Sequence, residues 1–141
     1  MIRLSWSLLA SLLATVLIIG DVALGEQVHV LTVEQLHAAL SKGPSREEKG
    51  FLLVDVRTPE EHRAGIIPGT DFNIDFREIA ARHRELGAQP DDHIVVYCQS
   101  GRRSSIAAKA LADLGYRHVY NLDGSMNAWM EAGFPVERPR R

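Results

Sequence analysis

The sequence has few of the residues from which disulfides, metal sites and nucleic-acid surfaces are built. Its 141 residues include a single cysteine, Cys98, so no disulfide can form within the chain. The six histidines are scattered, and no pair has metal-ligand spacing with a cysteine or an acidic cluster. We therefore expect no metal and no cofactor. The net charge of −2 offers no basic footprint, which argues against nucleic acid as a partner.

The N-terminal segment has the pattern of a secretory signal peptide. Arg3 supplies a positive charge, residues 8–19 form a mostly apolar run, and Ala23-Leu24-Gly25 offers small residues for cleavage. We expect residues 1–25 to be removed and the protein to be periplasmic or otherwise exported, with no stable membrane association afterwards. The alternative is an uncleaved N-terminal helix that anchors the chain, although the run is short for a span of about 20 residues.

The rest of the chain alternates between strand and helix patterns. The apolar runs 51–56 and 93–98 are typical of strands buried on both faces of a parallel sheet. Further strands are expected at 28–31, 71–75 and 118–122, and helices at 32–40, 59–63, 76–86, 104–114 and 126–132. This alternation predicts an α/β fold with a mostly parallel sheet. We expect residues 26–137 to form one monomeric domain, followed by a basic tail at 138–141.

Two segments carry finer expectations about local structure. The stretch Lys42–Gly50 is polar and contains glycine and proline, which predicts a loop. The helix expected at 76–86 is charged and amphipathic, with Phe76, Ile79, Ala80 and His83 facing inward.

Two further groups of residues have a structural interpretation. Met126, Trp129 and Met130 form an apolar stripe at helical spacing, for which core packing is expected. Asp55 and Arg57 follow a buried strand and could line a pocket. We favour a hydrogen-bonded pair that stabilises the fold, because buried charges are normally paired.

The segment with chemical potential begins at Cys98. This cysteine ends a buried strand, a short loop with Gly101 follows, and a helix is expected directly afterwards. Ligands bind at such carboxyl ends of strands, where loop and helix N–H groups face outward without partners. These groups, together with Arg102 and Arg103, are expected to lower the pKa of the thiol and so activate Cys98 as a nucleophile. A buried, inert cysteine is the alternative.

Three ordered motifs give the chain a family resemblance. The loop Cys98-x-x-Gly101-x-Arg103 resembles the active-site loop of the rhodanese homology domain. Residues 53–69 are similar to that family's N-terminal signature, and residues 121–136 are similar to its C-terminal one. The resemblance covers residues 30–136. It departs from the family at Ile66, Thr70 and His62, where we expect packing differences only.

The resemblance implies both a fold and an activity. The implied fold is a five-stranded, mostly parallel sheet flanked by helices on both faces. The implied enzyme is a sulfurtransferase that moves sulfur from thiosulfate or a similar small donor to a thiol or cyanide through a persulfide on Cys98. With export, the chain resembles small periplasmic thiosulfate sulfurtransferases of the phage-shock type. Substrate contacts would come from the rest of the loop, namely Gln99, Ser100, Gly101, Arg102, Arg103 and Ser104.

Two alternatives to turnover of a small donor remain open. A persulfide carrier that receives sulfur from a protein would use the same loop. A phosphatase or arsenate reductase of related fold would use Cys-x5-Arg. Here the spacing from Cys98 to Arg103 is Cys-x4-Arg, and Ser104 stands one position further on. The shorter loop makes a smaller cradle, which favours sulfur over phosphate.

Overall fold

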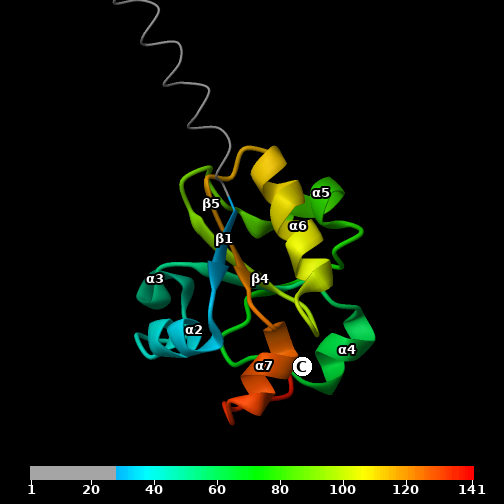
Figure 1. Cartoon of the computed structure of the whole chain (residues 1–141). Coiled ribbons are helices and arrows are strands. Elements are labelled where there is room, and N and C mark those ends of the chain that lie inside the picture. Colours follow the sequence, from blue (N-terminus) through cyan, green and yellow to red (C-terminus); the bar gives the residue numbers. More distant parts are fainter. Residues whose placement is uncertain (1–27) are drawn as a thin grey trace, which may run out of the picture.

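The computed structural model describes residues 28–141, so the expected signal peptide lies outside the described residues. A five-stranded sheet forms the centre of the molecule (Figure 1). Its order is β1-β5-β4-β2-β3, and every strand pair is parallel. The strands are β1 (Val28–Leu31), β2 (Leu52–Asp55), β3 (Phe72–Asn73), β4 (His93–Tyr97) and β5 (His118–Leu122).

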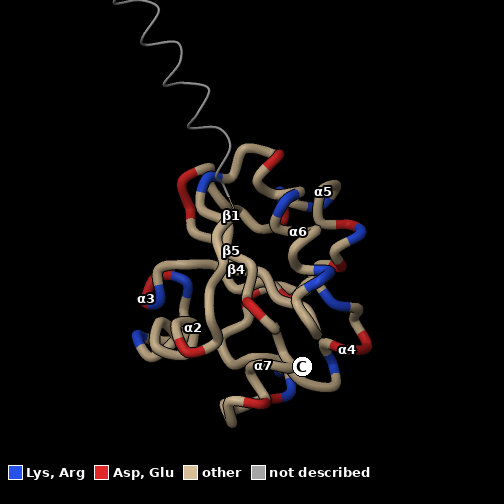
Figure 2. Tube along the Cα trace, in the orientation of Figure 1, with Lys and Arg blue, Asp and Glu red and all other residues tan. Residues whose placement is uncertain are grey.

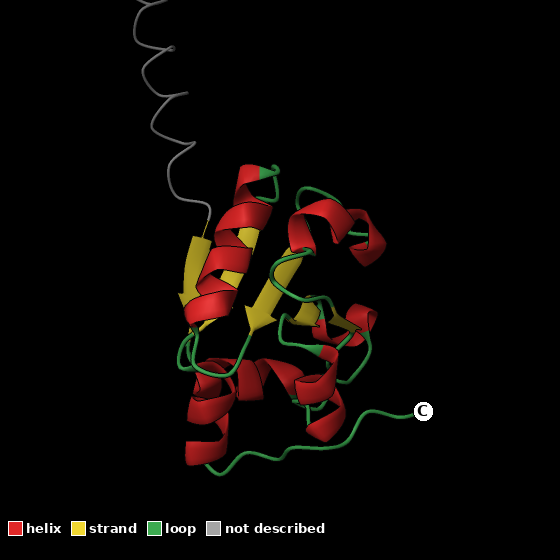
Figure 3. Cartoon of the chain, turned by 90° about the vertical axis from the view of Figure 1, so that its right-hand side faces the viewer, coloured by secondary structure: helices red, strands yellow, loops and turns green. Residues whose placement is uncertain are grey.

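Helices cover both faces of this sheet, as expected. The helices are α2 (Val33–Leu40), α3 (Arg46–Lys49), α4 (Pro59–Ala64), α5 (Ile79–Arg82), α6 (Arg102–Asp113) and α7 (Ser125–Glu131), and a 3-10 turn, η1, spans His83–Leu86. One apolar cluster joins a face of the sheet to α5 and α6, and a second joins the other face to α2 and α7. Figure 3 shows α6 lying in front of the strands and running alongside them. The chain therefore forms a three-layered α/β domain.

Strand β4 shows why its buried residues, 94–97, are all apolar. Ile94 and Val96 pack in the α5/α6 cluster, whereas Val95 and Tyr97 pack in the α2/α7 cluster. Alternate residues of one strand thus serve both cores, which leaves no position for a polar residue after the exposed His93. Cys98 continues the alternation into the α5/α6 cluster.

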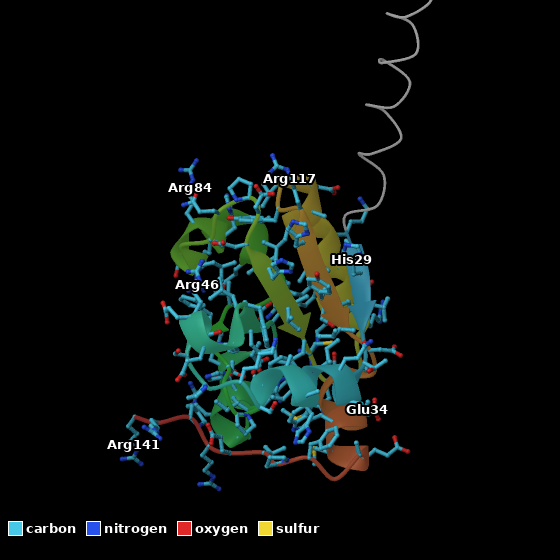
Figure 4. The ribbon with its side chains drawn as sticks, turned by 90° about the vertical axis from the view of Figure 1, so that its left-hand side faces the viewer. His29, Glu34, Arg46, Arg84, Arg117 and Arg141 are labelled. Atoms are coloured by element: carbon cyan, nitrogen blue, oxygen red, sulfur yellow. The ribbon has the colours of Figure 1, made fainter. Side chains whose placement is uncertain are left out.

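The ends of the sheet differ in what they carry. His29 and Arg117 lie near the amino ends of their strands, and Arg84 lies at the same end of the molecule (Figure 4). Helices α4 and α7 lie at the opposite end, beside the carboxyl ends of the strands (Figure 1). Charged residues are found mainly on the surrounding helices and loops (Figure 2). Because α6 starts directly after the loop that follows β4, this loop lies among α4, α6 and α7.

Two local predictions were wrong. The stretch 42–50, expected as a loop, contains α3, because Ser45 and Glu48 form a reciprocal capping box. The helix expected at 76–86 is reduced to α5 and the 3-10 turn. Ile79 is buried as expected and Phe76, which lies before the helix, packs against the α5/α6 cluster, but Ala80 is exposed.

Two further corrections concern helix ends and faces. Helix α6 begins at Arg102, two residues earlier than expected, so both arginines of the loop lie in its first turn. Trp129 and Met126 are buried as expected. Met130 is 58% exposed, so the apolar stripe of α7 turns partly towards solvent.

Candidate active site

The loop after β4 presents the sulfur of Cys98 to the start of α6. Gly101 has a φ of 102°, a conformation that other residues adopt only with strain, and it directs the chain into α6. The backbone N–H of Gly101 donates to Cys98 Sγ over 3.0 Å, and Ser104 Oγ lies 3.3 Å from the same sulfur. The sulfur is thus surrounded by hydrogen-bonding groups of its own loop.

These contacts decide the ionisation of Cys98. The side chain is fully buried, and burial alone raises the pKa of the thiol. Hydrogen bonds from the Ser104 hydroxyl and from the backbone N–H groups of Ser104, Gly101 and Ser100 act in the opposite direction. Together they outweigh burial, so the pKa of Cys98 lies below its ordinary value. The site therefore stabilises the thiolate, which is the nucleophilic form, relative to that of an ordinary cysteine.

The two arginines of the loop differ in their partners and exposure. Arg103 donates two hydrogen bonds of 2.7 and 2.8 Å to Glu61 on α4. The bonds to Glu61 raise the pKa of Arg103, and a smaller contribution comes from the charge of Cys98. Arg102 is exposed and has no salt bridge within residues 28–141. Ser104 and the loop N–H groups, rather than arginine side chains, are the direct partners of the sulfur.

A buried hydroxyl network lies behind the sulfur. Ser104 Oγ donates to Asn121 Oδ1 over 2.6 Å and lies 3.3 Å from Ser125 Oγ. Ser125 Oγ accepts from the backbone N–H of Cys98 over 3.1 Å and donates to Leu122 O over 3.0 Å. This network connects the first turn of α6 with the end of β5 and the start of α7.

Ser125 holds an unusual backbone conformation. Its φ of 49° makes it the one non-glycine residue with positive φ among residues 28–141. Such a conformation costs on the order of 1 kcal/mol and persists where the surroundings impose it. Its hydroxyl is the acceptor for the Cys98 N–H, so the strain lies directly beside the nucleophile.

The remaining loop residues face outward. Gln99 donates to Asn127 Oδ1 over 2.6 Å and accepts from Arg57 over 3.4 Å. Ser100 is exposed. These residues line the outer side of the loop and do not touch Sγ through their side chains.

Asp55 and Arg57 form the expected structural pair. Arg57 donates to both carboxylate oxygens of Asp55, over 2.9 and 2.8 Å, and both side chains are buried. His62 Nδ1 lies 3.0 Å from Asp55 Oδ2. The expectation of a mere packing difference at His62 was therefore wrong, because the ring joins this polar network.

Asn121, Ser125 and Glu61 were not among the residues predicted for the site. Asn121 lies in β5, Ser125 begins α7, and Glu61 comes from α4. Glu61 lies in the first turn of α4 and completes the capping box of Thr58. No local pattern shows that it also binds Arg103.

The described part of the chain, residues 28–141, has no cluster of histidine, cysteine and acidic side chains that could hold a metal ion. Over the same range no helix is both long and apolar enough to cross a bilayer.

Comparison with known proteins gives the family. Residues 32–132 match the Rhodanese-like domain, and the chain belongs to that family. A "Sulfurtransferase" of Allochromatium vinosum is 40% identical over 93 residues, which cover 66% of this chain and 84% of the relative. A "Putative thiosulfate sulfurtransferase, mitochondrial" of Schizosaccharomyces pombe is 36% identical, over 65% of this chain and 71% of the relative.

A solved structure extends the comparison to three dimensions. A Rhodopseudomonas palustris protein, described as of unknown function and a possible tyrosine phosphatase, has a TM-score of 0.63 and 31% identity, over 83% of this chain and 92% of its own. The rhodanese fold predicted from the sequence is confirmed, and the sulfurtransferase relatives support an enzyme of the rhodanese type.

Proposed function

We propose that this protein is a thiosulfate sulfurtransferase that carries the transferred sulfur as a persulfide on Cys98. One observation carries the proposal. The sulfur of Cys98 lies at the carboxyl end of β4 with the Gly101 N–H at 3.0 Å and Ser104 Oγ at 3.3 Å. This arrangement stabilises a thiolate at the position where a donor sulfur would be attacked.

Two displacements would complete the reaction. Cys98 Sγ attacks the outer sulfur of thiosulfate, a new S–S bond forms, and sulfite leaves with the electrons of the old S–S bond. A nucleophile such as cyanide or a thiolate then attacks the outer sulfur of the persulfide. It departs with that sulfur, and the Cys98 thiolate is regenerated. The loop N–H groups supply hydrogen bonds to the negative charge on whichever sulfur carries it.

Burial of Cys98 sets a condition on this mechanism. Its side chain is fully covered, so a donor reaches Sγ only when neighbouring side chains of the loop move. The exposed Arg102 lies at the start of α6, where a dianion such as thiosulfate gains both its charge and the positive end of the helix dipole. Arg102 is therefore the residue to which we assign capture of the donor.

A steady-state assay with thiosulfate and cyanide tests the proposal. The wild-type protein should form thiocyanate catalytically, and Cys98→Ser should form none. Ser105→Ala, on the exposed side of α6, is the matched control and should behave as wild type. A single turnover without a steady state would instead support a carrier that receives sulfur from a protein donor.

Phosphatase activity is the second candidate, because of the description given to the Rhodopseudomonas palustris protein. The short Cys-x4-Arg loop argues against it, and Arg103 is engaged by Glu61 rather than free to hold a phosphate. Hydrolysis of a phosphate monoester with a catalytic constant above that of thiosulfate transfer would replace the proposal.

We also propose that the protein acts after export, as a monomer without stable membrane association, in the manner of the phage-shock type. The support is the signal-peptide pattern of residues 1–25. N-terminal sequencing of protein from the exported fraction should begin near Glu26, and sedimentation should give the monomer mass. Intact residues 1–25 in the membrane fraction would indicate the anchored alternative.

A further inference from the structure

We infer that Asn121 is a positioning residue that competes with the sulfur of Cys98 for the one proton of the Ser104 hydroxyl. The inference rests on the proposed function only in that Cys98 acts as a thiolate. It does not depend on which donor brings the sulfur. Asn121 thereby sets how strongly Ser104 supports the thiolate.

The competition follows from the position of Ser104 Oγ. This oxygen is buried in the first turn of α6, 2.6 Å from Asn121 Oδ1 and 3.3 Å from Cys98 Sγ. A hydroxyl has one proton to donate and two lone pairs that accept. Only one of the two neighbours can therefore receive the Ser104 proton at a time.

Asn121 is held so that its acceptor faces Ser104. Its Nδ2 donates to Gly101 O over 3.3 Å, and a carbonyl oxygen can only accept. The opposite orientation of the amide would place Oδ1 against that carbonyl. Oδ1 therefore faces Ser104, and the short Ser104–Asn121 contact takes the proton away from the sulfur.

The Ser125 hydroxyl cannot take the place of Ser104 as a hydrogen-bond donor to the sulfur. This hydroxyl donates to Leu122 O over 3.0 Å and accepts from the Cys98 N–H. The remaining contact, between Ser125 Oγ and Ser104 Oγ at 3.3 Å, has no proton that is not already used. When Cys98 is a neutral thiol, every proton of the network has an acceptor, because the S–H group then donates to Ser104 Oγ.

Ionisation of Cys98 changes this arrangement. The thiolate keeps the Gly101 N–H, but it gains the Ser104 hydroxyl only if that proton turns away from Asn121 Oδ1. Oδ1 then loses its donor, which offsets part of the gain. In the persulfide the charge moves to the outer sulfur, and the Ser104 proton can return to Asn121. Asn121 thus disfavours the bare thiolate relative to the thiol and the persulfide.

The charged groups around the loop are held by other partners. From α4, Glu61 binds Arg103 of α6. After β2, Asp55 binds Arg57 and His62. These pairs do not contact Asn121, so a change at Asn121 leaves them in place.

Arg102 and Asp75 also carry charges near the loop. Arg102 is exposed, and Asp75 is paired with Arg77. Neither residue contacts the Ser104 hydroxyl, so their charges are the same in every variant compared below.

Titration of the thiolate by its ultraviolet absorbance tests the inference directly. Cys98 is the only cysteine, and subtracting the spectrum of Cys98→Ser removes the tyrosine contribution. The method needs no reagent to reach the buried sulfur. We expect Asn121→Ala to move the midpoint to lower pH, with a thiolate fraction about two- to tenfold larger at a pH below both midpoints. Ser104→Ala should move it to higher pH.

The double variant shows whether Asn121 acts through Ser104. In Ser104→Ala/Asn121→Ala no shared proton remains, so the midpoint should equal that of Ser104→Ala alone. The matched control is Asn127→Ala, because Asn127 accepts from the exposed side chain of Gln99 on the outer side of the same loop. It should titrate as wild type.

An unchanged or higher midpoint for Asn121→Ala would overturn the inference, as would a full additional shift in the double variant. Circular dichroism reports whether the variants fold. If Asn121→Ala does not, Asn121→Asp keeps the acceptor and should move the midpoint to higher pH, and a shift to lower pH would overturn the inference. If the midpoints move as expected but the wild-type protein does not turn over thiosulfate, only the proposed function is contradicted.

Discussion

Arg103 and Glu61 are joined by two parallel hydrogen bonds of 2.7 and 2.8 Å, which tie the first turn of α6 to α4. The two side chains are 28% and 32% exposed, so water screens the pair only in part. The bridge holds one wall of the loop that carries Cys98. It also uses the charge of Arg103, which leaves Arg102 as the cation available to a substrate.

Acid should weaken this bridge with a definite sign. Hydrogen bonds from Arg103, opposed by burial, lower the pKa of Glu61 from 4.5 to about 2. A carboxylate with a depressed folded-state pKa stabilises the fold above its unfolded pKa, and this contribution is lost as the pH falls through the folded value. We expect Glu61→Gln to cost up to about 1 kcal/mol near neutral pH. Denaturant unfolding should show this difference shrinking between pH 4.5 and about 2. A constant difference would contradict the bridge.

The two arginines of the loop should respond differently to alanine. Arg102→Ala should raise KM for thiosulfate about tenfold with a smaller effect on kcat, because an exposed charge-assisted contact is lost. Arg103→Ala should lower kcat, because the loop loses its tie to α4 and the thiolate is misplaced. Added salt should weaken the wild type more than Arg102→Ala.

Arg84→Ala is the matched control for these variants, since Arg84 lies at the far end of the molecule from the loop (Figure 4). It should retain wild-type constants. Wild-type kinetics for both loop variants at both ionic strengths would show that the arginines are only solvated charges.

Ser125 offers a test of strain beside the nucleophile. Glycine adopts its φ of 49° freely, whereas alanine does not, and both lack the hydroxyl that accepts from the Cys98 N–H. We expect Ser125→Gly to be about 1 kcal/mol more stable than Ser125→Ala by denaturant unfolding. Both should transfer sulfur more slowly than wild type. Equal stabilities would mean that the backbone relaxes at this position.

Much of the fold could be predicted because burial leaves a direct pattern. Residues 52–54 of β2 and 94–97 of β4 are all apolar, since alternate residues serve two cores. The helices expected at 32–40 and 59–63 are present as α2 and α4, and both begin with a capping box. The 3-10 turn after α5 could not be predicted, because its charged residues have the same composition as a helix. Helix α3 could have been, from the Ser45–Glu48 capping box.

The site could be predicted only where it is continuous in sequence. Cys98, Gly101 and Ser104 lie within one loop and helix turn. Asn121 is 17 residues from Ser104, and Glu61 is 42 residues from Arg103. The parallel order of the strands brings these residues together, and no short-range pattern records it.

The mass of the intact protein after incubation with thiosulfate tests most directly whether Cys98 carries the transferred sulfur. We predict that the wild-type protein gains the mass of one sulfur atom, that cyanide removes it, and that Cys98→Ser gains nothing. An unchanged mass in protein that transfers sulfur, or full transfer by Cys98→Ser, would contradict the persulfide.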